Sequence, residues 1–68
     1  MGRFDVNAIR SDMDARGWMP THLAKAAGIS DMTLSRFLHG RIQTAKTASK
    51  IAQALGRPVR RYLRKVAA

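Results

Sequence analysis

Four internal glycines divide this chain into five segments, each about as long as a short helix. They are Gly17, Gly28, Gly40 and Gly56. Glycine commonly stands directly after a helix, where the chain leaves the last turn. Inside each segment the apolar residues recur with the 3.6-residue period of a helix, and no segment alternates apolar and polar residues as a strand does. The spacing therefore predicts an all-α fold, a compact bundle of five short helices.

Residues suited to helix starts stand at the head of each segment. The expected N-caps are Asp5, Ser30 and Thr44. Pro20 and Pro58 suit the first turn of a helix, because the amide hydrogen that proline lacks is not needed there. We expect the second helix over about 20–27 and the third over about 31–39. The fifth is expected to begin at Pro58 and to carry one apolar face made of Val59, Tyr62, Leu63 and Val66.

The chain is interpreted as a single domain, residues 1–68, and its composition excludes several functions. It has no cysteine, which excludes a disulfide framework and a cysteine zinc site. Two histidines, His22 and His39, are too few to close a zinc site, so we expect no metal and no cofactor. No apolar run approaches the ~18 residues of a membrane span. A fold this small offers no sizeable pocket for a small molecule, and we expect no enzyme activity.

The net positive charge lies entirely in the second half of the chain. Lys and Arg number 13 against 4 acidic residues, which gives a formal net charge of +9. Up to Asp31, four basic and four acidic residues cancel, whereas nine basic and no acidic residues follow it. Such asymmetry within one small domain favours a polyanionic partner.

Residues 20–40 combine two of the expected helices with a tight Gly-Ile-Ser turn. Ala24 is small enough to let the next helix cross closely, and Gly28 can take the positive φ that the turn requires. The apolar residues that fill the angle between the two helices are Leu23, Ile29, Leu34 and Phe37. This pattern is typical of a helix-turn-helix, whose second helix can enter the major groove of DNA.

The chain resembles the Cro/repressor-type helix-turn-helix proteins of phages and bacteria, the XRE-like group. The matching residues are Leu23-Ala24, Ala27-Gly28-Ile29-Ser30, Leu34-Ser35-Arg36, Gly40 and Lys50-Ile51-Ala52-Gln53-Ala54-Leu55-Gly56. The resemblance covers about residues 5–66 and implies a lambda-repressor-like fold that binds operator DNA. One departure is the start of the second helix, where Met19 and Pro20 replace a polar N-cap and a Gln that contacts the DNA in the family.

The outward face of the third helix carries the expected base-reading residues. They are Asp31, Met32, Ser35 and Arg36. The Arg36 guanidinium can bond guanine O6 and N7 together, and its alternatives are a phosphate or solvent. Met32 suits a thymine methyl group or else fills a gap in the core. Asp31 either accepts from cytosine or serves only the helix N-terminus, and Ser35 bonds a base edge or water.

A second set of residues is expected to bind DNA phosphates, which fix register without reading sequence. The set consists of Thr21, Ser30, Thr33, Arg41, Gln43, Thr44 and Lys46. The resemblance supports Ser30 and Thr33, and it implies that the stretch after the recognition helix runs along the backbone. A phosphate, a dimer interface and solvent all remain open as surroundings for Arg57, Arg60, Arg61 and Arg64.

These features predict a sequence-specific regulator, a repressor or Cro-like protein, that binds double-stranded operator DNA in the cytoplasm or nucleoid. A homodimer on an inverted repeat is expected, because one recognition helix rarely supplies enough affinity. Two alternatives remain open. A DNA-bending or excision factor binds with little sequence preference. An antitoxin-type module binds a toxin through surface apolar residues, for which the candidates are Tyr62, Val66, Ala67 and Ala68.

Overall fold

The computed structural model describes residues 3–63 and is helical throughout. The elements are α1 (Val6–Arg16), α2 (Pro20–Ala27), α3 (Asp31–Leu38), α4 (Ala45–Leu55) and η1, a turn of 3-10 helix (Val59–Tyr62). Within this part of the chain there is no strand, only an isolated antiparallel bridge between Phe4 and Leu63. The all-α fold is confirmed, and α2 and α3 cover residues 20–27 and 31–38.

The helix starts follow from the capping residues. The side chains of Asp5, Ser30 and Thr44 accept hydrogen bonds from the backbone N–H three residues later, at 3.1, 3.1 and 3.2 Å. α2 is the exception, because its N-cap Met19 has no side chain that can accept and Pro20 opens the helix instead. α2 ends at Gly28, whose φ of +70° lets the chain turn sharply toward α3.

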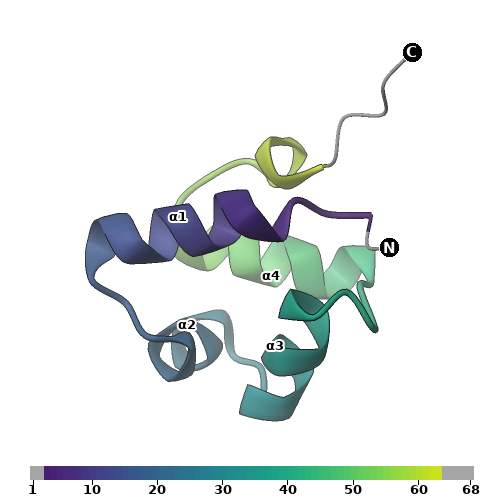
Figure 1. The fold of residues 1–68 in the computed structure, drawn as a ribbon, viewed down its shortest axis with the longest axis horizontal. Coiled ribbons are helices and arrows are strands. Elements are labelled where there is room, and N and C mark those ends of the chain that lie inside the picture. The colour runs from purple at the N-terminus through teal and green to yellow at the C-terminus, as the bar shows by residue number, and fades with distance from the viewer. Residues whose placement is uncertain (1–2, 64–68) are drawn as a thin grey trace.

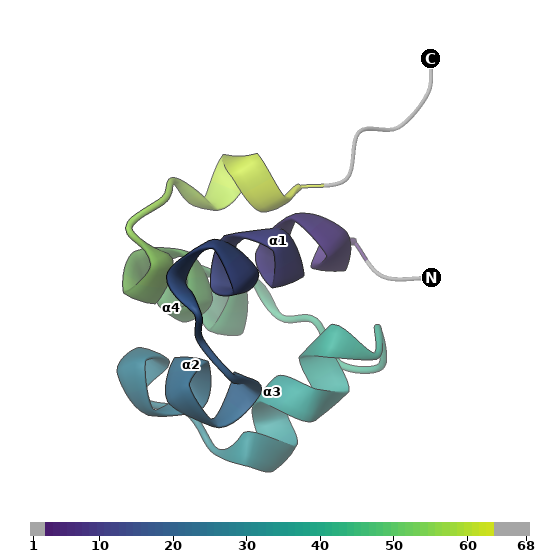
Figure 2. The same cartoon turned by 60° about the vertical axis from the view of Figure 1, so that its left-hand side comes forward.

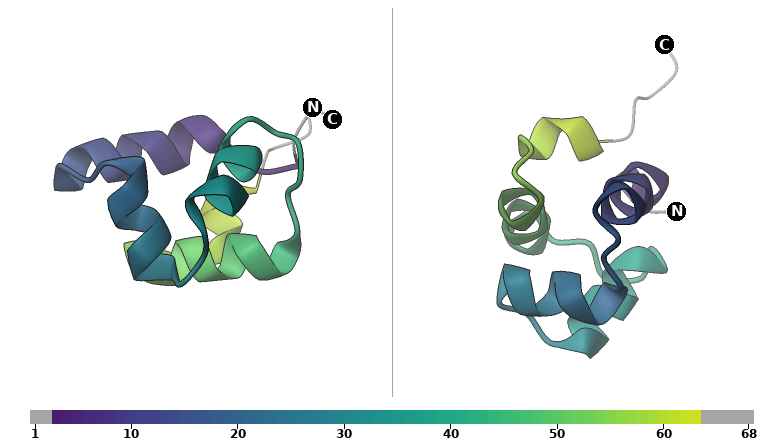
Figure 3. Two further views of the ribbon diagram at one scale, coloured as in Figure 1. Left: turned by 90° about the horizontal axis from the view of Figure 1, so that it is seen from below. Right: turned by 90° about the vertical axis from the view of Figure 1, so that its left-hand side faces the viewer.

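The elements divide into two groups on either side of α1 and α4. α2 packs against α3 and α4, whereas η1 packs against α1 and α4. Figures 1 and 2 show η1, in yellow, on the far side of α1 and α4 from the α2–α3 pair. Seen from below, in the left panel of Figure 3, α2 and α3 lie nearest the viewer. The helix-turn-helix therefore forms one face of the molecule and η1 the opposite face.

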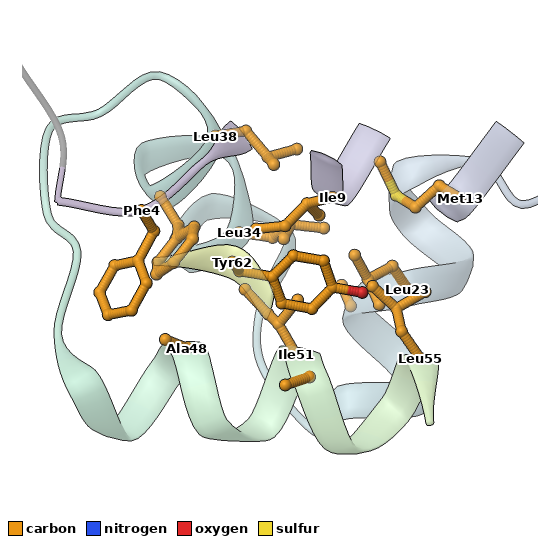
Figure 4. Packing of buried hydrophobic residues seen from close by; sticks show 13 residues of the cluster. Phe4, Ile9, Met13, Leu23, Leu34, Leu38, Ala48, Ile51, Leu55 and Tyr62 are labelled. Atoms are coloured by element: carbon orange, nitrogen blue, oxygen red, sulfur yellow. The ribbon is translucent and has the colours of Figure 1, made fainter. Parts of the chain in front are cut away.

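One hydrophobic core joins the two groups. All five elements and Phe4 contribute buried side chains to it, including Ile9, Leu23, Phe37 and Ile51. Tyr62 is the largest of the fully buried side chains, and its ring lies in the middle of the cluster (Figure 4). The short turn η1 is thus required to complete the core.

The last element differs from the expected fifth helix. Of the three described residues on its expected apolar face, only Tyr62 is buried; Val59 and Leu63 are 36% and 44% exposed. The reason is local, because Leu63 has an extended backbone (φ −74°, ψ 133°) and pairs with Phe4, which ends the helix after one turn. Val66, the fourth expected residue, lies outside the described residues.

Asp12 is a buried acidic residue of α1, which its local sequence does not predict. It is 5% exposed and accepts two hydrogen bonds from Arg61, Nε to Oδ2 at 2.9 Å and Nη2 to Oδ1 at 3.1 Å. The hydroxyl of Tyr62 donates a third, to Oδ2 at 2.6 Å. The bond from Arg61 lowers the pKa of Asp12 to about 2, although burial opposes the shift. α1 and η1 are therefore joined by a charged, hydrogen-bonded cluster beside the core.

Candidate nucleic-acid interface

α2, the turn and α3 form a rigid unit with one buried and one exposed face. Leu23 and Ala24 of α2 are buried against the core, and Ile29 in the turn packs against it. On α3 the buried residues are Leu34, Phe37 and Leu38. The opposite face of α3 is in solvent, as the helical period predicts.

The four expected base-reading residues all lie on this exposed face of α3. Asp31, Met32, Ser35 and Arg36 are each exposed. Met32 is 62% exposed, which excludes the alternative that it fills a gap in the core. The Arg36 guanidinium makes no hydrogen bond or ion pair with any residue from 3 to 63, so it is available to an external acceptor. The arrangement can present one cation, one carboxylate, one hydroxyl and one thioether to a groove.

Two pairs of hydroxyls flank the exposed face at helix starts. Ser30 donates to the Thr33 Oγ1 at 2.8 Å, and Thr44 donates to the Thr47 Oγ1 at 2.9 Å. In each pair the same capping oxygen also accepts the backbone N–H, so the hydroxyl dipoles are fixed in direction. The hydroxyls of Thr33 and Thr47 keep their own protons and can donate them to a phosphate.

The other expected phosphate contacts divide into two kinds. Thr21, Arg41 and Lys46 are exposed, and within residues 3–63 their side chains make no hydrogen bond. Gln43 differs, because both polar atoms of its amide are bonded inside the fold. Its Oε1 accepts from the Phe4 N–H at 3.1 Å, and its Nε2 donates to the Phe37 carbonyl at 2.8 Å. Gln43 therefore joins the loop between α3 and α4 to the N-terminal segment at Phe4 and to the end of α3 at Phe37.

The two histidines make contacts with other residues rather than with each other. His22 stacks on Trp18 with ring centroids 4.8 Å apart, and the Arg16 guanidinium lies 5.9 Å from the centroid of the same indole. His39 donates from Nδ1 to the Ser35 carbonyl at 2.7 Å. In the described part of the chain no three His, Cys, Asp or Glu side chains lie close enough together to hold a metal ion.

Exposed positive charge continues along the chain after α3. Arg36, Arg41 and Lys46 come from α3, the loop and the start of α4, and all three are exposed. The basic residues of η1 lie on the opposite face, and one of them, Arg61, is bound to Asp12. None of the helices between residues 3 and 63 has the length and apolarity needed to cross a membrane.

The comparisons with known proteins agree with this geometry. A family model described as helix-turn-helix matches residues 9–62, which span α1 to η1. No curated protein and no solved structure matches the chain significantly.

Proposed function

Because this chain belongs to the Cro/repressor-type (XRE-like) family of helix-turn-helix proteins, we propose that it represses or activates a promoter by inserting α3 into the major groove of a specific operator. DNA binding in transcription regulation is the function of this family. The observation that carries the finer proposal is the exposed face of α3, where Arg36 has no partner within residues 3–63.

Arg36 is the principal base reader in this proposal. Its guanidinium binds O6 and N7 of one guanine, a contact that discriminates against other bases by about 1–3 kcal/mol. Met32, one turn earlier and largely exposed, packs on a thymine methyl group. Ser35 and Asp31 complete the set, with Asp31 accepting from cytosine N4.

Phosphate contacts fix α3 in this groove. The proposed contacts are Thr21, Ser30, Thr33, Arg41, Thr44 and Lys46. Gln43 supports them by holding the loop, since its amide is bonded to Phe4 and Phe37. These contacts supply affinity that falls steeply with salt and carries no sequence preference.

The protein is proposed to act as a homodimer on an inverted repeat in the cytoplasm or nucleoid. Half-sites one helical turn apart follow from the spacing of successive major grooves. Two exposed apolar surfaces are candidates for the dimer contact: Ile42 in the loop after α3, and Val59 with Leu63 at η1.

Selection from a random-sequence duplex library, repeated at two salt concentrations, tests this function. Enrichment of an inverted repeat containing guanine at a fixed half-site position supports a dimeric operator binder. An unenriched pool that is retained strongly at low salt and lost at high salt contradicts sequence-specific reading and supports a DNA-bending factor instead.

Of the four residues named for the antitoxin-type alternative, the described part of the chain contains only Tyr62. Tyr62 is 1% exposed, so it offers no contact to a partner. The other candidates, Val66, Ala67 and Ala68, lie outside the described residues. Co-purification of a second protein with the chain tests this alternative directly.

A further inference from the structure

A cleft of about 360 Å³ lies where α1, the start of α2 and α3 meet. Its polar lining consists of Arg10, Thr21, Asp31, Ser35 and His39. Two of these come from α3, His39 directly follows it as its C-cap, and Thr21 comes from the start of α2, so the cleft belongs to the helix-turn-helix face. Arg10 is the only one of the five that comes from outside the helix-turn-helix.

Arg10 has no role in holding the fold. It is exposed, and within residues 3–63 its side chain makes no hydrogen bond and no ion pair. The other arginine of α1 behaves differently. Arg16 donates to the Asp12 carbonyl at 3.0 Å and to the Leu55 carbonyl, which closes the C-terminal end of α4. A guanidinium that the fold does not use, in a cleft beside the recognition helix, is available for a ligand.

We propose that Arg10 binds a DNA phosphate at this cleft and so anchors the duplex from α1. The inference rests on the proposed function, because a duplex read by α3 passes the residues of α3 that line the cleft. A planar guanidinium can bond two oxygens of one phosphate, and the Thr21 hydroxyl can donate a further bond. The chain thereby gains a cationic contact at the start of α2, where Met19 and Pro20 supply none.

Asp31 is the competing partner for Arg10. Its carboxylate lines the same cleft and attracts a guanidinium, although no ion pair joins the two within 4.0 Å. If Arg10 turned to Asp31 on DNA, it would act through that carboxylate on the base that Asp31 contacts. The two roles differ in measurable ways, because a phosphate contact changes the salt dependence of binding whereas an orienting contact changes base preference.

The test compares Arg10→Ala with Arg60→Ala, since each removes one exposed positive charge from the chain. Arg60 lies on η1, across α1 and α4 from α3, and its side chain makes no hydrogen bond with the described residues. Binding constants are measured at four salt concentrations, on the duplex selected from the library and on a random duplex of equal length. Circular dichroism checks that both variants keep the helical content of the parent chain.

Arg10→Ala is expected to weaken binding about tenfold on both duplexes and to reduce the slope of log K against log salt by about 0.9. Arg60→Ala is expected to stay within about twofold of the parent chain on both duplexes. Arg10→Lys, which keeps the charge, should restore most of the slope. Equal behaviour of Arg10→Ala and Arg60→Ala would overturn the proposal.

Two further outcomes separate this proposal from its alternatives. Loss of preference at a single base position, with the salt slope unchanged, assigns Arg10 to Asp31 and rejects the phosphate contact. If the library yields no enriched sequence, operator reading fails. A reduced slope for Arg10→Ala on the random duplex then still supports the anchor, so the two proposals can fail separately.

Discussion

Arg61 binds Asp12 through two parallel hydrogen bonds, although 49 residues of chain separate them. The carboxylate belongs to α1 and the guanidinium to η1, and Tyr62 donates to the same carboxylate. The three groups fix the last described element onto the first helix. They also make the fold depend on the charge of one buried carboxylate.

Acid is expected to remove the stability that the ionised Asp12 carboxylate contributes to the fold. The pKa of Asp12 is lowered from 3.8 to about 2 in the folded protein, chiefly by the bond from Arg61. A lowered folded-state pKa stabilises the protein above the unfolded-state value, and the contribution is lost as the pH falls from about 4 to 2. Thermal melts across that range should show this loss. Asp12→Asn should lower Tm at pH 7 by about 10 °C and should lack the Asp12 part of the acid transition.

The Tyr62 hydroxyl is expected to lose its proton at a higher pH than a free tyrosine does. Burial, followed by the bond to Asp12, raises its pKa to about 12. The neutral phenol therefore stabilises the fold below the unfolded-state value of about 10, and this contribution is lost as the pH rises to 12. The chain contains one tyrosine, so the absorbance of the phenolate reports this residue alone. A midpoint near 10 in the folded protein would contradict the buried geometry. Asp12→Asn should lower the midpoint only in part, because burial is the larger cause.

Gln43 is expected to determine whether the N-terminal segment at Phe4 stays packed at the end of α3. Gln43→Ala leaves the Phe4 N–H and the Phe37 carbonyl without their side-chain partner, at a cost of about 1–3 kcal/mol. Hydrogen exchange at the Phe4 amide should accelerate. Gln43→Glu is the comparison variant: it keeps an acceptor for the Phe4 N–H, but it replaces the donor to Phe37 with a carboxylate oxygen that repels the Phe37 carbonyl. Unchanged exchange at Phe4 in Gln43→Ala would show that other contacts hold the segment.

Removal of the Arg36 side chain and removal of the Lys46 side chain are expected to change DNA binding in different ways. Arg36→Ala should reduce discrimination at one operator position by about 1–3 kcal/mol. Lys46→Ala should weaken specific and random duplexes alike and reduce the salt slope by about 0.9. Competition binding against a panel of single-base operator variants measures both effects. If Arg36→Ala lowered the affinity for specific and random DNA equally, Arg36 would be assigned to a phosphate contact and not to a base.

Local signals were sufficient to predict the four α-helices. Asp5, Ser30 and Thr44 act through atoms three residues away, so a short stretch of sequence contains both the cap and its partner. The 3.6-residue period of apolar residues is also a local signal, and in α4 it places the buried Ala48, Ile51, Ala52 and Leu55 on one face. The position of the exposed face of α3 followed for the same reason.

Contacts between distant residues were not predictable in this way. Asp12 on a helix has the sequence pattern of a surface residue, and only the fold brings Arg61 and Tyr62 to it. Gln43 belongs to a polar loop, yet it meets Phe4 from the other end of the chain. Arg10 lies in the half of the sequence whose charges cancel, so the net charge of that half does not indicate a DNA contact there.

The position of Tyr62 in the core has a consequence for synthesis of the protein on the ribosome. The side chain that fills the middle of the core is added after all four α-helices have been translated. Until residues 61 and 62 leave the exit tunnel, Asp12 lacks the hydrogen bonds from Arg61 and Tyr62, and the core lacks the Tyr62 ring. A nascent chain that already contains the complete α2–α3 unit still lacks the largest buried side chain of its core, so we expect stable folding only after residue 62 has left the tunnel.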